Sequence, residues 1–172
     1  MKPIILILSS AVLAVVCAVG VTVMPHQTAK AAPATQIVRF WYPDADGQLC
    51  FIDREVDLSS GSTSALLADA YKQAPPQSLG LVFSSGTAIN SLTPGNDGVV
   101  SIDLNRAFQQ EMNAGASYER LILKCVANTF AGFYNADRVL LTVEGRPYVS
   151  GHIVMETGEY LTVSDSDAAI AE

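Results

Sequence analysis

The sequence predicts an α+β fold, a two-layer sandwich in which a mostly antiparallel sheet carries two main helices on one face. Three observations predict it. Several segments have the composition or alternation typical of strands, two segments have helical apolar spacing, and Asp-Gly pairs stand where hairpin turns are expected. The expected order of elements is β-β-α-β-β-α-β.

Five segments are expected as strands, because each alternates apolar and polar side chains or is rich in β-branched and aromatic residues. They are residues 37–42, 49–56, 88–92, 99–104 and 138–144. Asp46-Gly47 and Asp97-Gly98 close the first two pairs, since such dipeptides supply the positive φ angles of tight hairpin turns. A return strand within residues 148–154 is a further expectation.

Two segments are expected as amphipathic helices, residues 63–72 and 117–130. In the second, apolar side chains recur at i, i+1, i+4, i+5, i+8 and i+9, and Glu119 and Asn128 are expected outside this stripe. Each apolar stripe needs a surface to cover it, so both helices are placed on the dry face of one sheet.

Composition narrows the function classes. The chain has 172 residues, of which 49% are hydrophobic and 16% charged, so it can bury a core. The formal charge of −7 disfavours nucleic acid, because a phosphate-backbone binder needs a basic surface. Three cysteines and two histidines are too few for a convincing structural zinc site, and we expect no cofactor.

Residues 1–31 are expected to be a signal peptide or an N-terminal membrane anchor. Ile4 to Met24 is a run of 21 residues without a charge, long enough for an anchor. Ala29-Lys30-Ala31 has the small residues of a cleavage site after Ala31. A lipid-modified Cys17 is a third alternative, disfavoured by the bulky Val that precedes it. Each alternative puts the rest of the chain outside the cytoplasm, secreted or anchored to the outer face of the membrane.

The remaining chain is divided into a linker at 32–35, one domain at 36–155 and an acidic C-terminal tail at 156–172. Cleavage after Ala31 would leave 8 basic and 17 acidic residues. Anionic lipid head groups repel such a surface, so we expect membrane contact only through the N-terminal segment.

Six short motifs occur in order between residues 36 and 153. They are Val38-Arg-Phe-Trp-Tyr-Pro-Asp-Ala-Asp-Gly47, Ala65-Leu-Leu67, Ser85-Gly-Thr87, Val100-Ser-Ile-Asp-Leu-Asn-Arg-Ala-Phe108, Val139-Leu-Leu-Thr-Val-Glu-Gly-Arg-Pro147 and Gly151-His152. Their order and spacing resemble the GerMN domain of bacterial sporulation and spore-germination proteins. The resemblance implies an envelope domain without known catalysis that serves in assembly or binding.

Two pairs of residues are candidate interaction sites. Trp41 and Tyr42 point to opposite faces of their strand, so one of them is expected on the helix-free face, where an aromatic side chain can belong to an interface. Arg120 and Lys124 lie at i, i+4 on the outer helix face and can form a docking patch in an otherwise acidic protein.

Cys50 and Cys125 are both expected on apolar sides of their elements. A disulfide between them and a pair of buried free thiols remain alternatives, because a disulfide needs Cα atoms about 4.4–6.8 Å apart.

The expected function is non-enzymatic protein association in the cell envelope, with an envelope protein of unknown identity or with a second copy. One alternative is a module for small ligands such as peptidoglycan fragments, using Trp41 or Tyr42 as a stacking platform. The other is an envelope hydrolase that uses His152 with nearby carboxylates, which requires a pocket where these groups converge.

Overall fold

A computed structural model describes residues 35–112, 115–163 and 169–170. All of them belong to a compact unit that spans residues 33–172. The predicted signal peptide or anchor (1–31), its cleavage site after Ala31 and nearly all of the linker lie outside the described residues. Within those residues, no helix has both the length and the apolar character that crossing a membrane requires.

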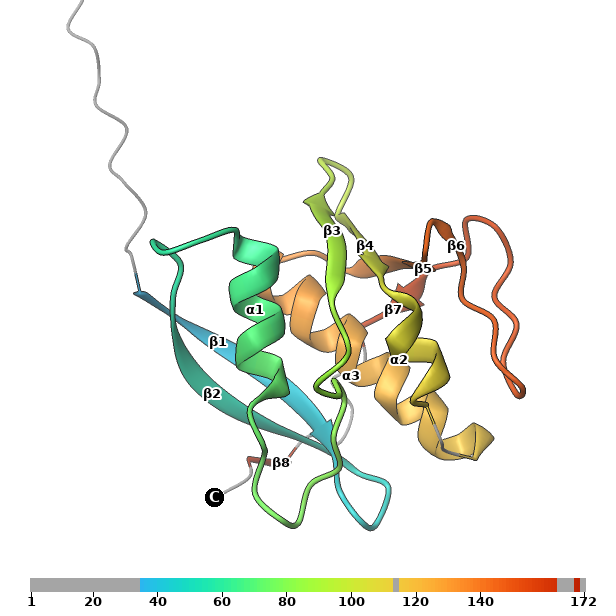
Figure 1. Cartoon of the computed structure of the whole chain (residues 1–172), viewed down its shortest axis with the longest axis horizontal. Helices are drawn as coiled ribbons and strands as arrows, with labels where there is room; N and C mark the ends of the chain where they lie inside the picture. Colours follow the sequence, from blue (N-terminus) through green and yellow to red (C-terminus); the bar gives the residue numbers. More distant parts are fainter. Residues whose placement is uncertain (1–34, 113–114, 164–168, 171–172) are drawn as a thin grey trace, which may run out of the picture. The chain divides into compact units, whose positions relative to one another are not determined.

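The described residues form strands and helices in the predicted order, with a short helix α2 added before α3 and three short strands added at the end (Figure 1). The elements are β1 (Thr35–Pro43), β2 (Leu49–Asp57), α1 (Thr63–Lys72), β3 (Ile89–Pro94), β4 (Val99–Leu104), α2 (Arg106–Gln110), α3 (Ala116–Tyr134), β5 (Arg138–Val143), β6 (Arg146–Pro147), β7 (Leu161–Thr162) and β8 (Ala169–Ile170). The α+β class and the mostly antiparallel pairing are confirmed.

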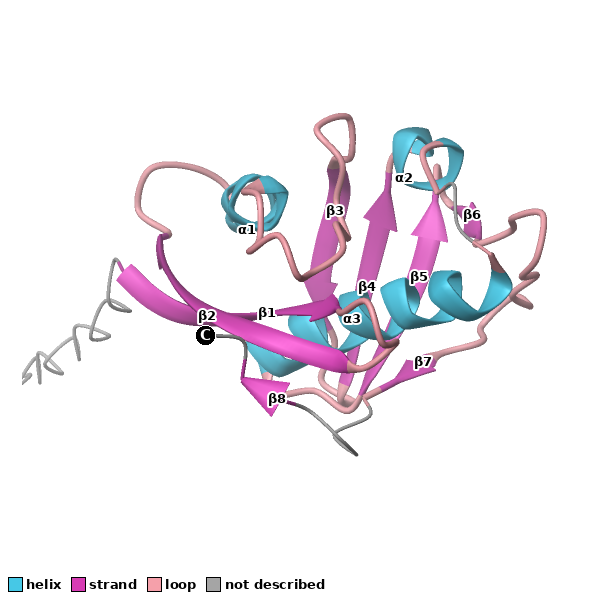
Figure 2. Ribbon diagram, turned by 90° about the horizontal axis from the view of Figure 1, so that it is seen from below, coloured by secondary structure: helices cyan, strands magenta, loops and turns pink. Residues whose placement is uncertain are grey.

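The strands form two sheets, which corrects the prediction of a single one. One sheet has the order β1-β2-β8, and the other has the order β3-β4-β5-β6 with β7 paired to β5. Strands β4 and β5 are parallel, so the chain must cross over between them, and α2 and α3 make this connection. Figure 2 shows α3 running across β4 and β5.

Helix α3 packs against β1 of the first sheet and against β4, β5 and β7 of the second. Between Ile122 and Ala131 every residue except Lys124 is buried. A helix buried on more than one side needs more than one apolar surface to cover it, which is why its partner strands divide into two sheets. Helix α1 lies beside β2 and β3 and joins the same core.

A cluster of aromatic rings joins α1, α3 and the segment before β3. The ring of Tyr71 lies 4.8 Å from that of Phe83 and 6.1 Å from that of Phe130, measured between centroids. All three side chains are fully buried. Rings at these distances add to the stabilisation that their apolar area already provides.

A buried hydrogen-bond network crosses this cluster. The backbone N–H of Trp41 donates to Thr129 Oγ1 at 3.0 Å, and the hydroxyl of Tyr71 donates to the carbonyl of Trp41 at 2.5 Å. Thr129 Oγ1 in turn donates to the Tyr71 hydroxyl at 3.2 Å. Two side chains from α1 and α3 thereby satisfy both backbone groups of one residue on β1, where water cannot reach them.

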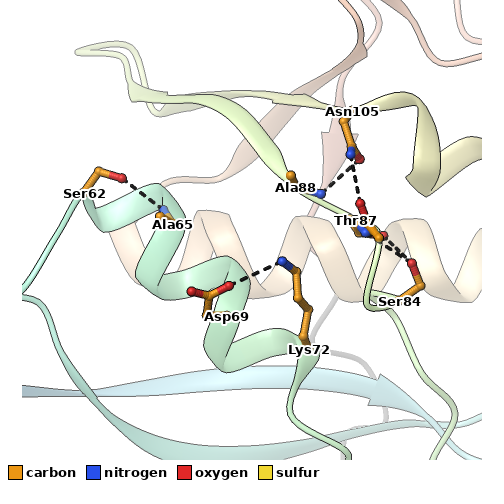
Figure 3. A network of polar contacts seen from close by, with 9 residues as sticks. Ser62, Ala65, Asp69, Lys72, Ser84, Thr87, Ala88 and Asn105 are labelled. Carbon is orange, nitrogen blue, oxygen red and sulfur yellow. Dashed lines mark hydrogen bonds and ion pairs between the residues drawn. The ribbon is translucent and has the colours of Figure 1, made fainter.

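Polar contacts fix where the helices α1 and α2 begin (Figure 3). The Ser62 hydroxyl accepts a hydrogen bond from the Ala65 N–H, as an N-cap residue does. Asn105, before α2, instead uses its side chain to accept from the Ala88 N–H and to donate to the Gly86 carbonyl. It therefore links the start of α2 to the segment that leads into β3.

The ordered fold continues beyond residue 155, where the domain was predicted to end. Strand β7 pairs with β5 through Leu161 and Thr162. The strand that pairs back with β5 is β6, the two residues directly before the expected range 148–154, and within that range the structure has an isolated bridge between Val149 and Val154.

We predict that Thr129→Val lowers the free energy of unfolding by about 1–3 kcal/mol, because it leaves the buried Trp41 N–H without an acceptor. Tyr71→Phe is expected to act similarly by removing the donor to the Trp41 carbonyl. Urea unfolding of the two single variants and the double variant measures this. A double variant whose loss equals the sum of the single losses would contradict a shared network.

Asp103 generates a prediction about pH. Its carboxylate accepts from Thr142 Oγ1 at 2.6 Å, from the Gly145 N–H at 2.7 Å and from Asn90 Nδ2 at 2.9 Å. Burial alone would raise the pKa of Asp103, but the hydrogen bonds from Thr142, Asn90 and Gly145 outweigh it, and the pKa is lowered.

Because the pKa of Asp103 is lower in the folded chain than in the unfolded one, this carboxylate contributes stability above the unfolded pKa, which is lost as the pH falls through the folded pKa. We expect Asp103→Ala to cost about 1–3 kcal/mol at pH 7 and progressively less below about pH 4, measured by urea unfolding across the pH range. Glu55→Ala, at an exposed position of β2, is the matched control. A loss that stays constant from pH 7 to pH 2 would refute the assignment.

Candidate functional site

A wide hollow lies at one end of the second sheet. It has a volume of about 1020 Å³ and is lined by α2, the start of α3, the β5–β6 turn and the segment 147–157. We refer to it as the Glu119 cleft. Its charged lining residues are Arg106, Glu119, Glu144, Arg146, His152 and Glu156.

The β5–β6 turn fixes one wall of this cleft. Glu144 and Gly145 have φ angles of 51° and 72°, the positive values that a tight hairpin of this kind requires. Glu144 Oε1 accepts a hydrogen bond from the backbone N–H of Arg106 at 3.0 Å, and its own N–H donates to the Leu104 carbonyl. The turn is thus tied to the start of α2, and it brings Arg106 and Arg146 to the same cleft.

Glu119 is the most deeply placed charged residue of the cleft. It lies in the first turn of α3, its side chain is only 1% exposed, and its Oε1 accepts from the Tyr148 hydroxyl at 2.7 Å. Burial, and next the hydrogen bond to Glu119, raise the pKa of Tyr148 well above its ordinary value. The tyrosine therefore stays a hydrogen-bond donor at neutral pH.

His152 is exposed at the edge of the same cleft. Its backbone N–H donates to Ser150 Oγ at 3.0 Å. Among the residues that the structure describes, its imidazole forms neither an ion pair nor a hydrogen bond with a serine, a cysteine or a carboxylate. The cleft thus gathers His152 with Glu119, Glu144 and Glu156 without forming the hydrogen-bonded nucleophile–base pair on which covalent catalysis depends.

The predicted aromatic site takes a different form in the structure. Tyr42 is fully buried, and burial raises its pKa to about 12, so it belongs to the core. Trp41 is 6% exposed and packs on Phe51, with 5.3 Å between ring centroids. Neither residue provides the exposed stacking platform expected of a small-ligand module. Tyr42 is enclosed in the core, and Trp41 is covered by Phe51 and lies beside α3.

Trp41 does line a second, smaller hollow of about 460 Å³, which we refer to as the β1 groove. It lies between β1 and the C-terminal half of α3, and Asn128, Gly132 and Phe133 form its helical side. Ile37, at its edge, is 72% exposed, the largest exposed fraction among the large hydrophobic residues described. On the same sheet face, Arg39 forms two hydrogen bonds with Asp53 at 2.9 and 3.0 Å.

Among the strands that the structure describes, β1 pairs with β2 alone and lies at the edge of its sheet. The Trp41 N–H points away from β2, toward α3. Backbone groups alternate along an antiparallel strand, so the N–H and C=O of Ile37 and Arg39 point the same way as those of Trp41. No described backbone group pairs with them.

Cys50 and Cys125 are both free and buried, so the predicted disulfide between them is not formed. Cys125 lies in the middle of α3, and burial raises its pKa well above the ordinary value for a thiol. Burial also raises the pKa of Cys50, whose sulfur lies 3.9 Å from Asp44 Oδ2. Both positions on apolar faces were predicted correctly, and the alternative of two buried thiols is the one observed.

Arg120 and Lys124 are exposed on the outer side of α3, as expected. Neither forms a salt bridge with a residue that the structure describes. They remain a candidate docking patch. The same helix face was expected to expose Glu119 and Asn128, which are instead 1% and 2% exposed. Tyr148 contacts Glu119, and Asn128 lies beside β1.

Sequence reasoning did not single out Glu119, Tyr148, Arg106 or Arg146 as site residues. They are brought together by contacts between residues 29 to 40 positions apart. One local signal was available: Leu123 and Ala127 add apolar side chains outside the α3 stripe, which indicates burial on a second side.

The two-sheet arrangement around a long crossover helix defines a known class of domain, and the sequence comparison agrees. Residues 26–149 match the Germane family, described as sporulation and spore germination. The match covers more than half of the chain, and the protein therefore belongs to this family, the GerMN domains. A comparison with curated proteins found no match.

Two solved structures share the fold. The first GerMN domain of the sporulation protein GerM from Bacillus subtilis has a TM-score of 0.53 at 20% identity, covering 77% of this chain and 99% of that one. The tandem GerMN domains of the same protein give a TM-score of 0.57 at 18% identity, covering 83% of this chain and 49% of that one. At these identities the likeness establishes the fold.

We predict that thiol reagents leave Cys50 and Cys125 unmodified in the native protein and modify both after denaturation without reductant. The reason is that burial keeps both groups protonated and out of reach. Peptide mapping by mass spectrometry measures this and separates them from Cys17. Absence of labelling after denaturation would demonstrate a disulfide instead.

Proposed function

We propose that this protein is a non-enzymatic, extracytoplasmic domain that associates with another envelope protein, or with a second copy of itself, during spore formation or germination. Membership of the Germane family supports a role in spore formation or germination. The open edge of β1 beside the β1 groove is the observation that supports association. An exposed Ile37 next to backbone groups that have no backbone partner among the described residues suits strand addition, in which main-chain hydrogen bonds give affinity and an apolar side chain gives specificity.

The Arg39–Asp53 pair favours such a surface. Its two hydrogen bonds raise the pKa of Arg39 and lower that of Asp53, so both stay charged at neutral pH. The guanidinium also lies 3.7 Å from the centre of the Phe51 ring. Charged residues on an edge strand limit indiscriminate pairing, so a partner strand would have to place a compatible residue opposite them.

A hydrolase that uses His152 is the second candidate, because the Glu119 cleft brings this histidine near three carboxylates. The exposed imidazole without a hydrogen-bond partner among the described residues argues against it, as does a Cys125 thiol held protonated in the core. Turnover of an envelope substrate by the full chain, abolished in His152→Ala, would replace the association proposal by this one.

The association proposal predicts that Ile37→Asp lowers the yield of in-cell cross-links between the full chain and its partner by about tenfold or more, since it puts an unpaired charge at the centre of the contact. Leu81→Asp is the matched control, because Leu81 is also an exposed apolar residue, 54% exposed, but does not line the β1 groove.

Mass spectrometry of the cross-linked species identifies the partner and distinguishes an envelope protein from a second copy. Cell fractionation with protease protection checks the location of the domain. Equal losses in both variants, or none in either, would contradict the role of the β1 edge, and a protease-protected cytoplasmic domain would contradict the location.

A further inference from the structure

The association proposal makes no use of Glu119, although its environment is unusual for a carboxyl group. The side chain is 1% exposed at the floor of a cleft, and the hydrogen bond that it receives comes from the neutral hydroxyl of Tyr148. Removing an ionised carboxylate from water is strongly unfavourable unless a cation compensates it.

No described residue supplies that cation. The ion pairs within the described residues are Arg39 with Asp53 and Lys72 with Asp69, both outside the cleft. Arg106, Arg146 and His152 line the cleft but are exposed and form no salt bridge with Glu119. The structure thus offers an incoming cation a deep acceptor that is already held in place by a buried tyrosine.

The other residues that line the cleft indicate which further chemical groups the cationic ligand carries. Met112, Val149 and Met155 provide apolar wall, and the two arginines provide donors for an anionic group. Glu144 and Glu156 also line the cleft, so three carboxylates face two arginines and a histidine. That balance disfavours a polyanion, such as a nucleotide, and favours a ligand carrying one ammonium and one carboxylate.

We propose that the Glu119 cleft binds a short peptide with a free amino terminus and a free carboxyl terminus. The ammonium group lies against the Glu119 carboxylate, the carboxylate is held by Arg146 and Arg106, and the peptide body packs between Met112, Val149 and Met155. The volume of about 1020 Å³ is within the size range of sites that enclose small ligands. This site is separate from the β1 edge, so it stands or falls independently of the association proposal.

The test uses dialanine, trialanine and tetraalanine as probes, each with an N-acetylated and a C-amidated analogue. Binding to the full chain is followed by amide chemical-shift changes and titration calorimetry. We expect saturable binding of at least one uncapped peptide, with shifts confined to cleft residues. Acetylation should weaken it by about tenfold or more, and amidation should weaken it by a smaller factor, because the arginines are exposed and the glutamate is buried.

Two variants separate a binding role from a structural one. Glu119→Gln keeps the acceptor for Tyr148 but removes the charge, so it should abolish the preference for uncapped peptides while keeping or raising the melting temperature. Arg146→Gln should reduce the effect of amidation and leave the effect of acetylation unchanged, because Arg106 still contacts the peptide carboxylate. Glu55→Gln, at an exposed position of β2 outside the cleft, is the control.

Three results would overturn the proposal. They are equal binding of acetylated and free peptides, wild-type binding by Glu119→Gln, and no saturable shift with any probe up to about 10 mM, which is weaker than a useful site of this size. If Glu119→Gln does not fold, the comparison of capped with free peptides on the unaltered protein still decides the question.

Discussion

The fold depends on how the backbone of Trp41 is satisfied. Its N–H and C=O point away from β2 into a region without water, where the hydroxyls of Thr129 and Tyr71 meet them. Each hydroxyl belongs to a different helix, and the two also bond to each other. One residue of β1 therefore sets the positions of α1 and α3 together, and the ring cluster of Tyr71, Phe83 and Phe130 packs around that point. An apolar residue at either helical position would leave a buried polar group without a partner.

The sequence predicted local elements better than their assembly. The bounds of α1 agree with the prediction, because Ser62 caps one end and Pro75-Pro76 prevents continuation at the other. Helix α3 is longer than expected: Gly132 remains helical, and the chain leaves the helix at Asn135, which adopts the left-handed conformation with a φ of 52°. The division into two sheets was not predicted. It depends on strands packing against two sides of α3. The apolar pattern of one helix does not indicate which strands pack against it.

The same distinction holds for the candidate sites. Strand alternation and helical spacing were sufficient to assign three features. They are the outward direction of Trp41, the exposure of Arg120 and Lys124, and the buried positions of Cys50 and Cys125. The depth of Trp41 could not be assigned in this way, because it depends on how α3 packs beside β1. Glu119 was assigned to solvent by its place on the helical wheel, but Tyr148, far along the chain, covers it. The Glu119 cleft and the β1 groove are thus products of tertiary contacts, and each borders on α3.

The distance along the chain between Trp41 and Thr129 has a consequence for how the protein is made. The two residues are 88 positions apart, so the ribosome completes the β1–β2 hairpin long before the helix that satisfies its edge exists. Until α3 emerges, the part of that edge at Trp41 can also pair with a strand of a neighbouring nascent chain. Loop closure over such a span is slow compared with local hairpin formation, so the interval is built into the topology. During rapid synthesis, the β1–β2 hairpin of one nascent chain therefore has to be kept from pairing with that of another until α3 has been synthesised.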